Sequence, residues 1–247
     1  MVEIILVAVA AVIAGFTQGL AGFGSVLVVL PAFTALTGIK TAVPLANLFA
    51  IGLSLYLCVQ LRSVRHWSLI WPMIAAALPG IFFGTWLLKV VSARSLELAL
   101  AGTLGLFCIH TLLKQEYTKI FGRPWGYAAG FSSGLLGGSI GAYGPPVVLY
   151  FSVQPFNVEV AKSAMSGYFF LGGVGIGISH ALGGLIDSRV LFLTAISFPS
   201  LAVGVWLGSA CEGWLNQRIY QKIILILLLL FSVLLVCKPY LVALGAS

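Results

Sequence analysis

The chain has 247 residues, of which 60% are hydrophobic and only 8% are charged. A soluble domain carries about 25% charged residues, and a membrane-spanning helix needs roughly 20 mostly apolar residues. Because apolar stretches of that length fill nearly the whole sequence, we exclude a soluble domain and predict one polytopic α-helical membrane domain over residues 1–247. The formal charge of +7 comes from basic residues that lie mostly between the apolar stretches, so no dense basic face for nucleic acid is present.

The first predicted element is an apolar segment at 2–37, interrupted by the glycines of LAGFGS at 20–25. It is followed by three predicted helices at about 41–61, 66–89 and 94–114. A basic linker at 114–124 leads to a second apolar segment at 125–154, interrupted around Gly137–Pro146. Three further helices complete the chain, at about 158–184, 189–211 and 218–238. Both interruptions expose backbone N–H and C=O groups that lipid cannot satisfy, so we expect them to have a functional role.

Short motifs recur in the two halves of the chain. Four pairs share the same order: GFTQGLAG at 15–22 with GFSSGLLG at 130–137, FGSVLVVL at 23–30 with YGPPVVLY at 143–150, PGIFFGTWL at 79–87 with PSLAVGVWL at 199–207, and RSL at 94–96 with RIY at 218–220. Their nearly constant spacing predicts two homologous halves at about 1–115 and 124–240, which we expect to be inverted. Repeats with an interrupted segment in the same place of each half are typical of a transporter's binding site.

A helix break can bind an anion without a charged side chain. The second half of a broken helix begins with free backbone N–H groups and a partial positive charge, and both favour an anion. Gly24 and Gly144 would let the backbone approach a ligand closely, because no Cβ intervenes. Pro145 is tolerated in a first helical turn, and Ser25 is a suitable N-cap. We therefore expect the substrate to bind between the two breaks.

The candidate substrate-binding residues are those at the breaks and the polar residues that accompany them: Gly22, Phe23, Gly24, Ser25, Asn47, Ser139, Tyr143, Gly144, Pro145 and Ser166. Polar groups inside a membrane tend to mark pathways, but Asn47 could equally bond a neighbouring helix. Four glycines at GxxxG spacing are interpreted mainly as helix-packing residues: Gly15, Gly19, Gly130 and Gly134. Further polar residues lie next to the breaks: Thr17, Gln18, Ser132 and Ser133.

No cofactor and no metal site are predicted. The four cysteines are scattered in apolar surroundings without a CxxC pair, which is typical of packing residues: Cys58, Cys108, Cys211 and Cys237. His110 and His180 lie near predicted helix ends, where an interfacial side chain that reaches toward water is commoner than a proton relay.

The motifs GFTQGLAGFGS at 15–25 and GFSSGLLGGSIGAYGPPVVLY at 130–150 resemble those of the sulfite exporter TauE/SafE family, also called the toluene sulfonate uptake permeases. The resemblance covers essentially the whole chain. It implies a multi-pass permease of the bacterial inner membrane that moves small sulfur-containing or organic anions, such as sulfite, sulfoacetate or other sulfonates. GLAGFGS and GGSIGAYGPP contain no charged residue, so none of their residues explains coupling to an ion.

The alternatives are a passive anion channel, an intramembrane enzyme and a scaffold without transport activity. GFGS at 22–25 is similar to serine motifs of enzymes, but no His or Asp lies near it in the sequence, so we do not expect an enzyme. The expected partners are a small anionic substrate and the lipid bilayer, without nucleic acid. The coupling ion (proton or sodium), the direction of transport and a homo-oligomeric state are left open.

The basic residues indicate the topology. If each interrupted segment enters and leaves on one side of the membrane, or crosses it twice, eight basic residues share one side: Arg62, Arg65, Lys114, Lys119, Arg123, Lys162, Arg218 and Lys222. The other side then holds five: Lys40, Lys89, Arg94, Arg189 and Lys238. If each interrupted segment crosses once, the division is nearly even, so the positive-inside rule favours the first arrangement and places both termini outside.

Overall fold

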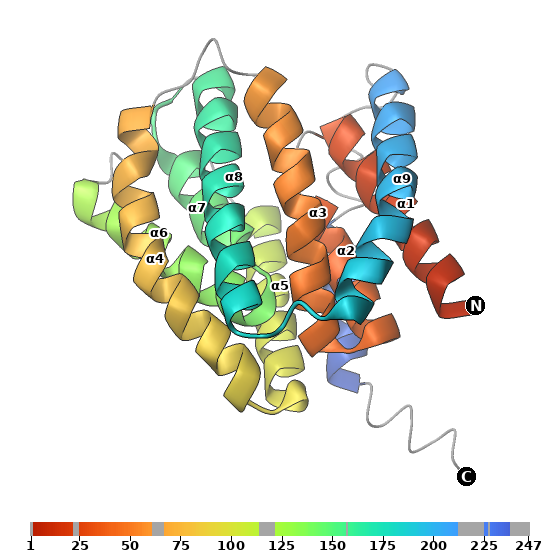
Figure 1. Ribbon diagram of the computed structural model, residues 1–247. Helices are drawn as coiled ribbons and strands as arrows, with labels where there is room; N and C mark the ends of the chain where they lie inside the picture. Colours follow the sequence, from red (N-terminus) through yellow and green to blue (C-terminus); the bar gives the residue numbers. More distant parts are fainter. Residues whose placement is uncertain are drawn as a thin grey trace.

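A computed structural model describes residues 2–21, 25–60, 67–113, 122–156, 158–211, 225–226 and 228–237. The elements of this described part are helices (Figure 1): α1 (Val2–Ala21), α2 (Ser25–Thr37), α3 (Ile39–Gln60), α4 (Trp67–Val90), α5 (Ala93–Leu113), α6 (Arg123–Ile140), α7 (Gly144–Val153), α8 (Val158–Leu182) and α9 (Ser188–Ala210). They are followed by a short apolar helix, Leu228–Cys237. Most of the predicted linker and the first part of the helix predicted at 218–238 lie outside the described residues.

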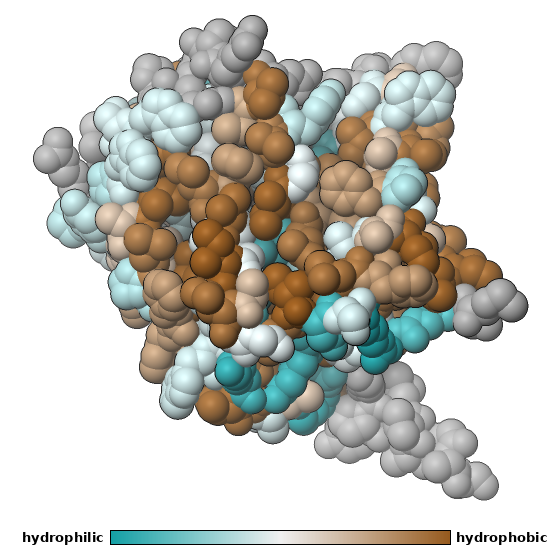
Figure 2. Space-filling model, in the orientation of Figure 1, coloured by the Kyte–Doolittle hydropathy of each residue, from teal (hydrophilic) through white to brown (hydrophobic). Residues whose placement is uncertain are grey.

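Five of these helices, α3, α4, α5, α8 and α9, are long and apolar enough to cross a membrane. The all-helical membrane class is therefore confirmed, and the predicted boundaries of these five spans agree with the observed helices to within a few residues. Apolar residues cover much of the face of the molecule shown in Figure 2. Exposed large apolar side chains include Trp71, Phe82, Phe83, Trp86, Leu106 and Trp206. An apolar surface of this extent suits contact with lipid tails.

Both interrupted segments consist of two helices. In the first, α1 ends at Ala21 and α2 begins at Ser25, and the glycines between them lie outside the described residues. In the second, α6 ends at Ile140 and α7 begins at Gly144. Gly141 adopts a φ of 72°, a left-handed conformation that glycine tolerates and that commonly ends a helix. The predicted break around Gly137–Pro146 is therefore observed at 141–143.

α1 packs side by side with α9 through glycines at the contact. A Cβ on Gly15 would collide with the carbonyl oxygen of Leu201, and one on Gly19 with that of Val205. From the other side, Gly204 faces the carbonyl oxygen of Val12. The contacts advance in the same direction along both helices, so α1 and α9 run parallel.

α6 packs on α4 in the same way. A Cβ on Gly130 would collide with the carbonyl oxygen of Met73, and one on Gly134 with that of Ala77. Gly80 in turn faces the carbonyl oxygen of Phe131. These helices also run parallel, and the packing role predicted for the GxxxG glycines of α1 and α6 is confirmed.

Contacts between helix ends fix which ends lie together. Arg189 forms an ion pair with Glu3, so α1 and α9 begin side by side. The Lys40 Nζ donates to the Lys89 carbonyl oxygen (3.0 Å), so α3 begins where α4 ends. A Cβ on Gly167 would lie 3.2 Å from Ile70, and the Ser179 Oγ donates to the Thr85 Oγ1, so α4 and α8 run parallel. We call the end of the bundle that holds Lys40 the Lys40 end; α1, α3 and α9 begin there, and α4 and α8 end there.

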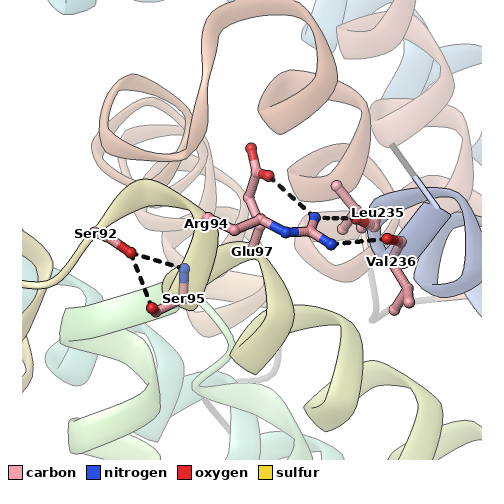
Figure 3. A network of polar contacts seen from close by, with 6 residues as sticks. All are labelled: Ser92, Arg94, Ser95, Glu97, Leu235 and Val236. Atoms are coloured by element: carbon pink, nitrogen blue, oxygen red, sulfur yellow. Dashed lines mark hydrogen bonds and ion pairs between the residues drawn. The ribbon is translucent and has the colours of Figure 1, made fainter. Parts of the chain in front are cut away.

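The helix Leu228–Cys237 is held against α5 by polar contacts (Figure 3). The Arg94 guanidinium donates to the carbonyl oxygens of Leu235 (2.6 Å) and Val236 (2.7 Å), and it lies 3.8 Å from the Glu97 carboxylate. These carbonyls belong to the last turn of the described helix. The Ser232 Oγ donates to the Ala101 carbonyl oxygen further along α5.

Candidate substrate-binding site

The break between α6 and α7 is stabilised by hydrogen bonds with α6 and by one contact from α8. The N–H of Gly141 donates to the Gly137 carbonyl (3.1 Å) and that of Ala142 to the Leu136 carbonyl (3.2 Å). The Gly138 carbonyl thereby loses the N–H that a continuous helix would give it, and the Nε2 of His180 lies 3.0 Å from it instead. The Ser133 Oγ donates to the Tyr143 carbonyl oxygen. Buried backbone groups at the break thus have side-chain partners, as a low-dielectric interior requires.

His180 differs from its predicted role. Its exposed fraction is 0%, so it is not an interfacial side chain that reaches toward water. The expectation was wrong because proximity to a helix end does not place a residue at the surface when neighbouring helices cover that end. His110, by contrast, is exposed near the end of α5.

Tyr143, the last residue of the break, inserts its side chain between α3 and α8. Its ring packs edge-on against Phe169 of α8, with centroids 5.3 Å apart and an interplanar angle of 87°. Its hydroxyl interacts with the Ser54 side chain of α3. Only 6% of the residue is exposed, so the hydroxyl lies deep in the protein.

Asn47 of α3 lies close to the same hydroxyl. Its Nδ2 donates to the Gly173 carbonyl oxygen of α8 (3.1 Å), whereas its Oδ1, in a residue only 3% exposed, has no hydrogen-bond partner among the described atoms. A Cβ on Gly173 would lie 3.8 Å from this Oδ1 and 3.9 Å from the Tyr143 hydroxyl. Asn47 and Tyr143 therefore meet next to Gly173, where the absence of a side chain leaves both polar atoms room.

Gly144 and Pro145 begin α7. A Cβ on Gly144 would have no heavy atom of the described residues within 4 Å, so these residues leave room beside the backbone. Pro145 is buried. Together with Pro146 it lacks an N–H, so the first turn of α7 offers fewer donors than an ordinary helix N-terminus. Of the first three residues of α7, only Gly144 has an N–H to offer, and that of Val147 bonds the Tyr143 carbonyl in the first helical turn.

The other candidate residues lie apart from this cluster. The Ser139 Oγ donates to the Leu135 carbonyl within α6, and Ser139 packs against Gly84 of α4. The Ser166 Oγ donates to the Ser163 carbonyl within α8, two helical turns before Gly173. Gly22, Phe23 and Gly24 lie outside the described residues, as does the side chain of Ser25.

The structure thus brings Asn47 and Tyr143 together, with Gly144 next to Tyr143 in the chain. It adds residues that the sequence did not single out as site residues: Ser54, Ser133 and Gly173. His180 lies outside this cluster, at the end of α6. The sequence feature that could have indicated Gly173 is the glycine-rich stretch FLGGVGIG at 170–177. In the structure Gly177 of this stretch also faces Asn47, because a Cβ on it would lie 3.4 Å from the Asn47 Nδ2. None of these residues carries a fixed charge. The cluster offers neutral donors and acceptors in a buried setting, where hydrogen bonds are stronger than in water.

Long apolar helices and two interrupted helix pairs define a multi-pass helical membrane protein, and interrupted helices of this kind are typical of transporters. Comparison with known families agrees, because residues 7–235 match the sequence profile of sulfite exporter TauE/SafE. The chain belongs to the sulfite exporter TauE/SafE family. It is also similar to a probable sulfite/organosulfonate exporter TauE of Cupriavidus necator, with 24% identity over 201 residues, which cover 78% of each chain. No solved structure matches the chain.

The family membership confirms the resemblance carried by the two glycine-rich motifs. It also confirms a multi-pass location in the membrane, consistent with the bacterial inner membrane, because the family consists of exporters and five helices are fit to span.

Proposed function

We propose that the protein is a permease that exports small sulfur-containing anions, namely sulfite and organosulfonates such as sulfoacetate. The observation that carries this proposal is the family match over residues 7–235, together with the polar cluster at the α6–α7 break. The name of the Cupriavidus necator relative points to the same substrates.

The substrate is proposed to bind between the two breaks, with Tyr143, Gly144 and Asn47 at the centre of the site; of the other residues expected from the sequence, Ser139 and Ser166 lie apart from it. The Tyr143 hydroxyl and the backbone N–H of Gly144 are donors suited to anionic oxygens, and the N-terminal end of α7 favours negative charge. The Asn47 Oδ1, which has no hydrogen-bond partner among the described atoms, is an acceptor. It suits a ligand that carries its own O–H, as hydrogensulfite does.

We further propose that the two halves are inverted copies. Two reciprocal contacts support this: the first helix of each half packs parallel on the third helix that follows the break in the other half, α1 on α9 and α6 on α4. The helix ends support it as well. In the first half, α1 begins at the Lys40 end, and α3, which follows the interrupted segment, begins there too. In the second half, α6 begins beside the start of α4, at the opposite end. Such a pair of breaks entering from opposite sides is the layout of many carriers.

Two measurements on the purified protein test the proposal. A thermal-stability screen against sulfite, thiosulfate, sulfoacetate, taurine and plain carboxylates is expected to give selective stabilisation by the sulfur-containing anions, because ligand binding raises stability by mass action. Proteoliposomes are expected to take up labelled sulfoacetate unaltered, with saturation and exchange.

Each alternative predicts another outcome. A channel gives conductance without saturation or exchange, and an enzyme alters the compound. The absence of both stabilisation and flux for every sulfur-containing anion would overturn the proposal.

A further inference from the structure

His180 is a buried titratable side chain that the proposed binding site does not use. It lies in the last turn of α8, and its Nε2 lies 3.0 Å from the Gly138 carbonyl oxygen at the end of α6. A carbonyl oxygen only accepts hydrogen bonds, so this contact requires a hydrogen on Nε2. His180 therefore supports the end of α6 at the break.

The other ring nitrogen of His180 is uncommitted. Its Nδ1 is buried and has no hydrogen-bond partner among the described atoms. With the hydrogen on Nε2, a neutral ring carries a free lone pair on Nδ1, which is the atom that accepts a proton when histidine becomes charged. A purely structural cap at Gly138 needs only Nε2, so it leaves Nδ1 unexplained.

The described hydrogen-bond contact of the ring is with an uncharged group. On α6 it contacts the Gly138 carbonyl, and on α4 Thr85 bonds Ser179, the residue before His180. Along α4 and toward α9, the nearest charged residues are Lys89, one turn beyond Thr85, and Asp187 at the start of α9. On α5, which also packs on α6, the buried Glu97 carboxylate lies 3.8 Å from the Arg94 guanidinium. The Asp187 carboxylate accepts from the Val190 N–H (2.8 Å). A proton on His180 thus has no neighbouring carboxylate among the described residues of α4, α6 and α8 to neutralise it.

The ring is close to the proposed substrate site. Gly177, which lies next to Asn47, precedes His180 by three residues, and Gly173 precedes it by seven. These separations correspond to about 5 and 10 Å along the axis of α8. A buried cation is costly unless an opposite charge accompanies it, and an anion at the break supplies that charge.

We propose that Nδ1 of His180 is the proton-binding site that couples proton movement to anion movement, an inference that rests on the proposed transport function. The lone pair of Nδ1 binds one proton while Nε2–H stays on the Gly138 carbonyl. The protonated ring and the anion at the break stabilise each other, so the proton and the anion bind together and are released together. The protein therefore carries a proton in the same direction as the anion.

Proteoliposomes loaded with a pH dye test this coupling with sulfoacetate between about pH 6.5 and 8, where its carboxyl and sulfonate groups stay ionised. The wild-type protein is expected to take up sulfoacetate at least fivefold faster when the outside is more acidic, and to acidify the lumen as it does so. His180→Gln retains an N–H for Gly138 but cannot hold the proton. It is expected to keep sulfoacetate binding and sulfoacetate exchange at equal pH within about threefold, while losing the response to the pH gradient and the acidification.

His110→Gln is the matched control, because it makes the same change at an exposed histidine of a spanning helix, and it is expected to behave as wild type. A wild-type protein that moves sulfoacetate without responding to the gradient and without acidification overturns the inference and leaves the proposed function intact. So does a folded His180→Gln protein with an unchanged gradient response. A wild-type protein that neither binds nor moves any sulfur-containing anion contradicts the proposed function itself.

Discussion

At the scale of single residues, the Tyr143 hydroxyl is the side-chain donor that the break presents to α3 and α8. Tyr143→Phe removes this oxygen and keeps the ring that packs on Phe169. A hydrogen bond to a charged group contributes about 1.5–3 kcal/mol, so we expect sulfite and sulfoacetate affinity to fall by at least tenfold. Titration calorimetry measures the affinity, and the melting temperature reports whether the fold is kept.

Tyr150→Phe is the control, because it removes the same hydroxyl group from a tyrosine further along α7. This variant is expected to bind as wild type. Ser166→Ala is also expected to have little effect, since the Ser166 hydroxyl bonds a carbonyl of its own helix. Unchanged affinity in Tyr143→Phe together with a large loss in Ser166→Ala would move the site along α8, away from the break.

The residues of the site were only partly predictable from the sequence. Asn47, Tyr143 and Gly144 were identified because polar and glycine residues inside apolar segments are conspicuous. His180 was misjudged and Gly173 was missed, because their roles depend on which helices cover them. A hydrophobicity pattern gives the period of a helix but not its neighbours.

At the scale of the elements, the parallel pairs α1–α9 and α4–α6 depend on glycines that let two backbones touch. Gly130→Val places a branched side chain against the backbone of Met73, so α4 and α6 must separate. We expect the melting temperature to fall by more than about 5 °C and the yield of folded protein to drop.

The matched control is Gly102→Val on α5, where a Cβ would have no heavy atom of the described part of the chain within 4 Å. Thermal unfolding of both variants, followed by size-exclusion chromatography, makes the comparison. Equal stability of the two variants would contradict the packing role assigned to Gly130.

The elements themselves were largely predictable, because their boundaries coincide with glycine, proline and charged residues. The break of the second half was expected around Gly137–Pro146 and lies at 141–143, where Gly141 takes the left-handed conformation. The pairing of helices was not predictable from the sequence. A GxxxG spacing indicates a packing face, but α1 on α9 and α4 on α6 join residues far apart in the chain.

At the scale of the whole molecule, the contacts at helix ends bear on membrane topology. They place the starts of α1, α3 and α9 at the Lys40 end, which is the side with fewer basic residues in the sequence. The positive-inside rule therefore predicts that the N-terminus faces outward. A cysteine introduced as Val2→Cys is expected to react with a membrane-impermeant maleimide on intact cells, whereas protection until lysis would reverse the orientation.

The central claim is that the helix breaks bind the transported anion. Gly144→Val tests it most directly, because a Cβ at this position meets no heavy atom of the described residues, so the change fills the approach to the backbone without disturbing packing. Calorimetric titration of the purified variant with sulfite and sulfoacetate is predicted to show no measurable binding, at a melting temperature within about 2 °C of the wild-type value. Gly24→Val is predicted to do the same in the first half, and wild-type affinity in both variants would contradict the claim.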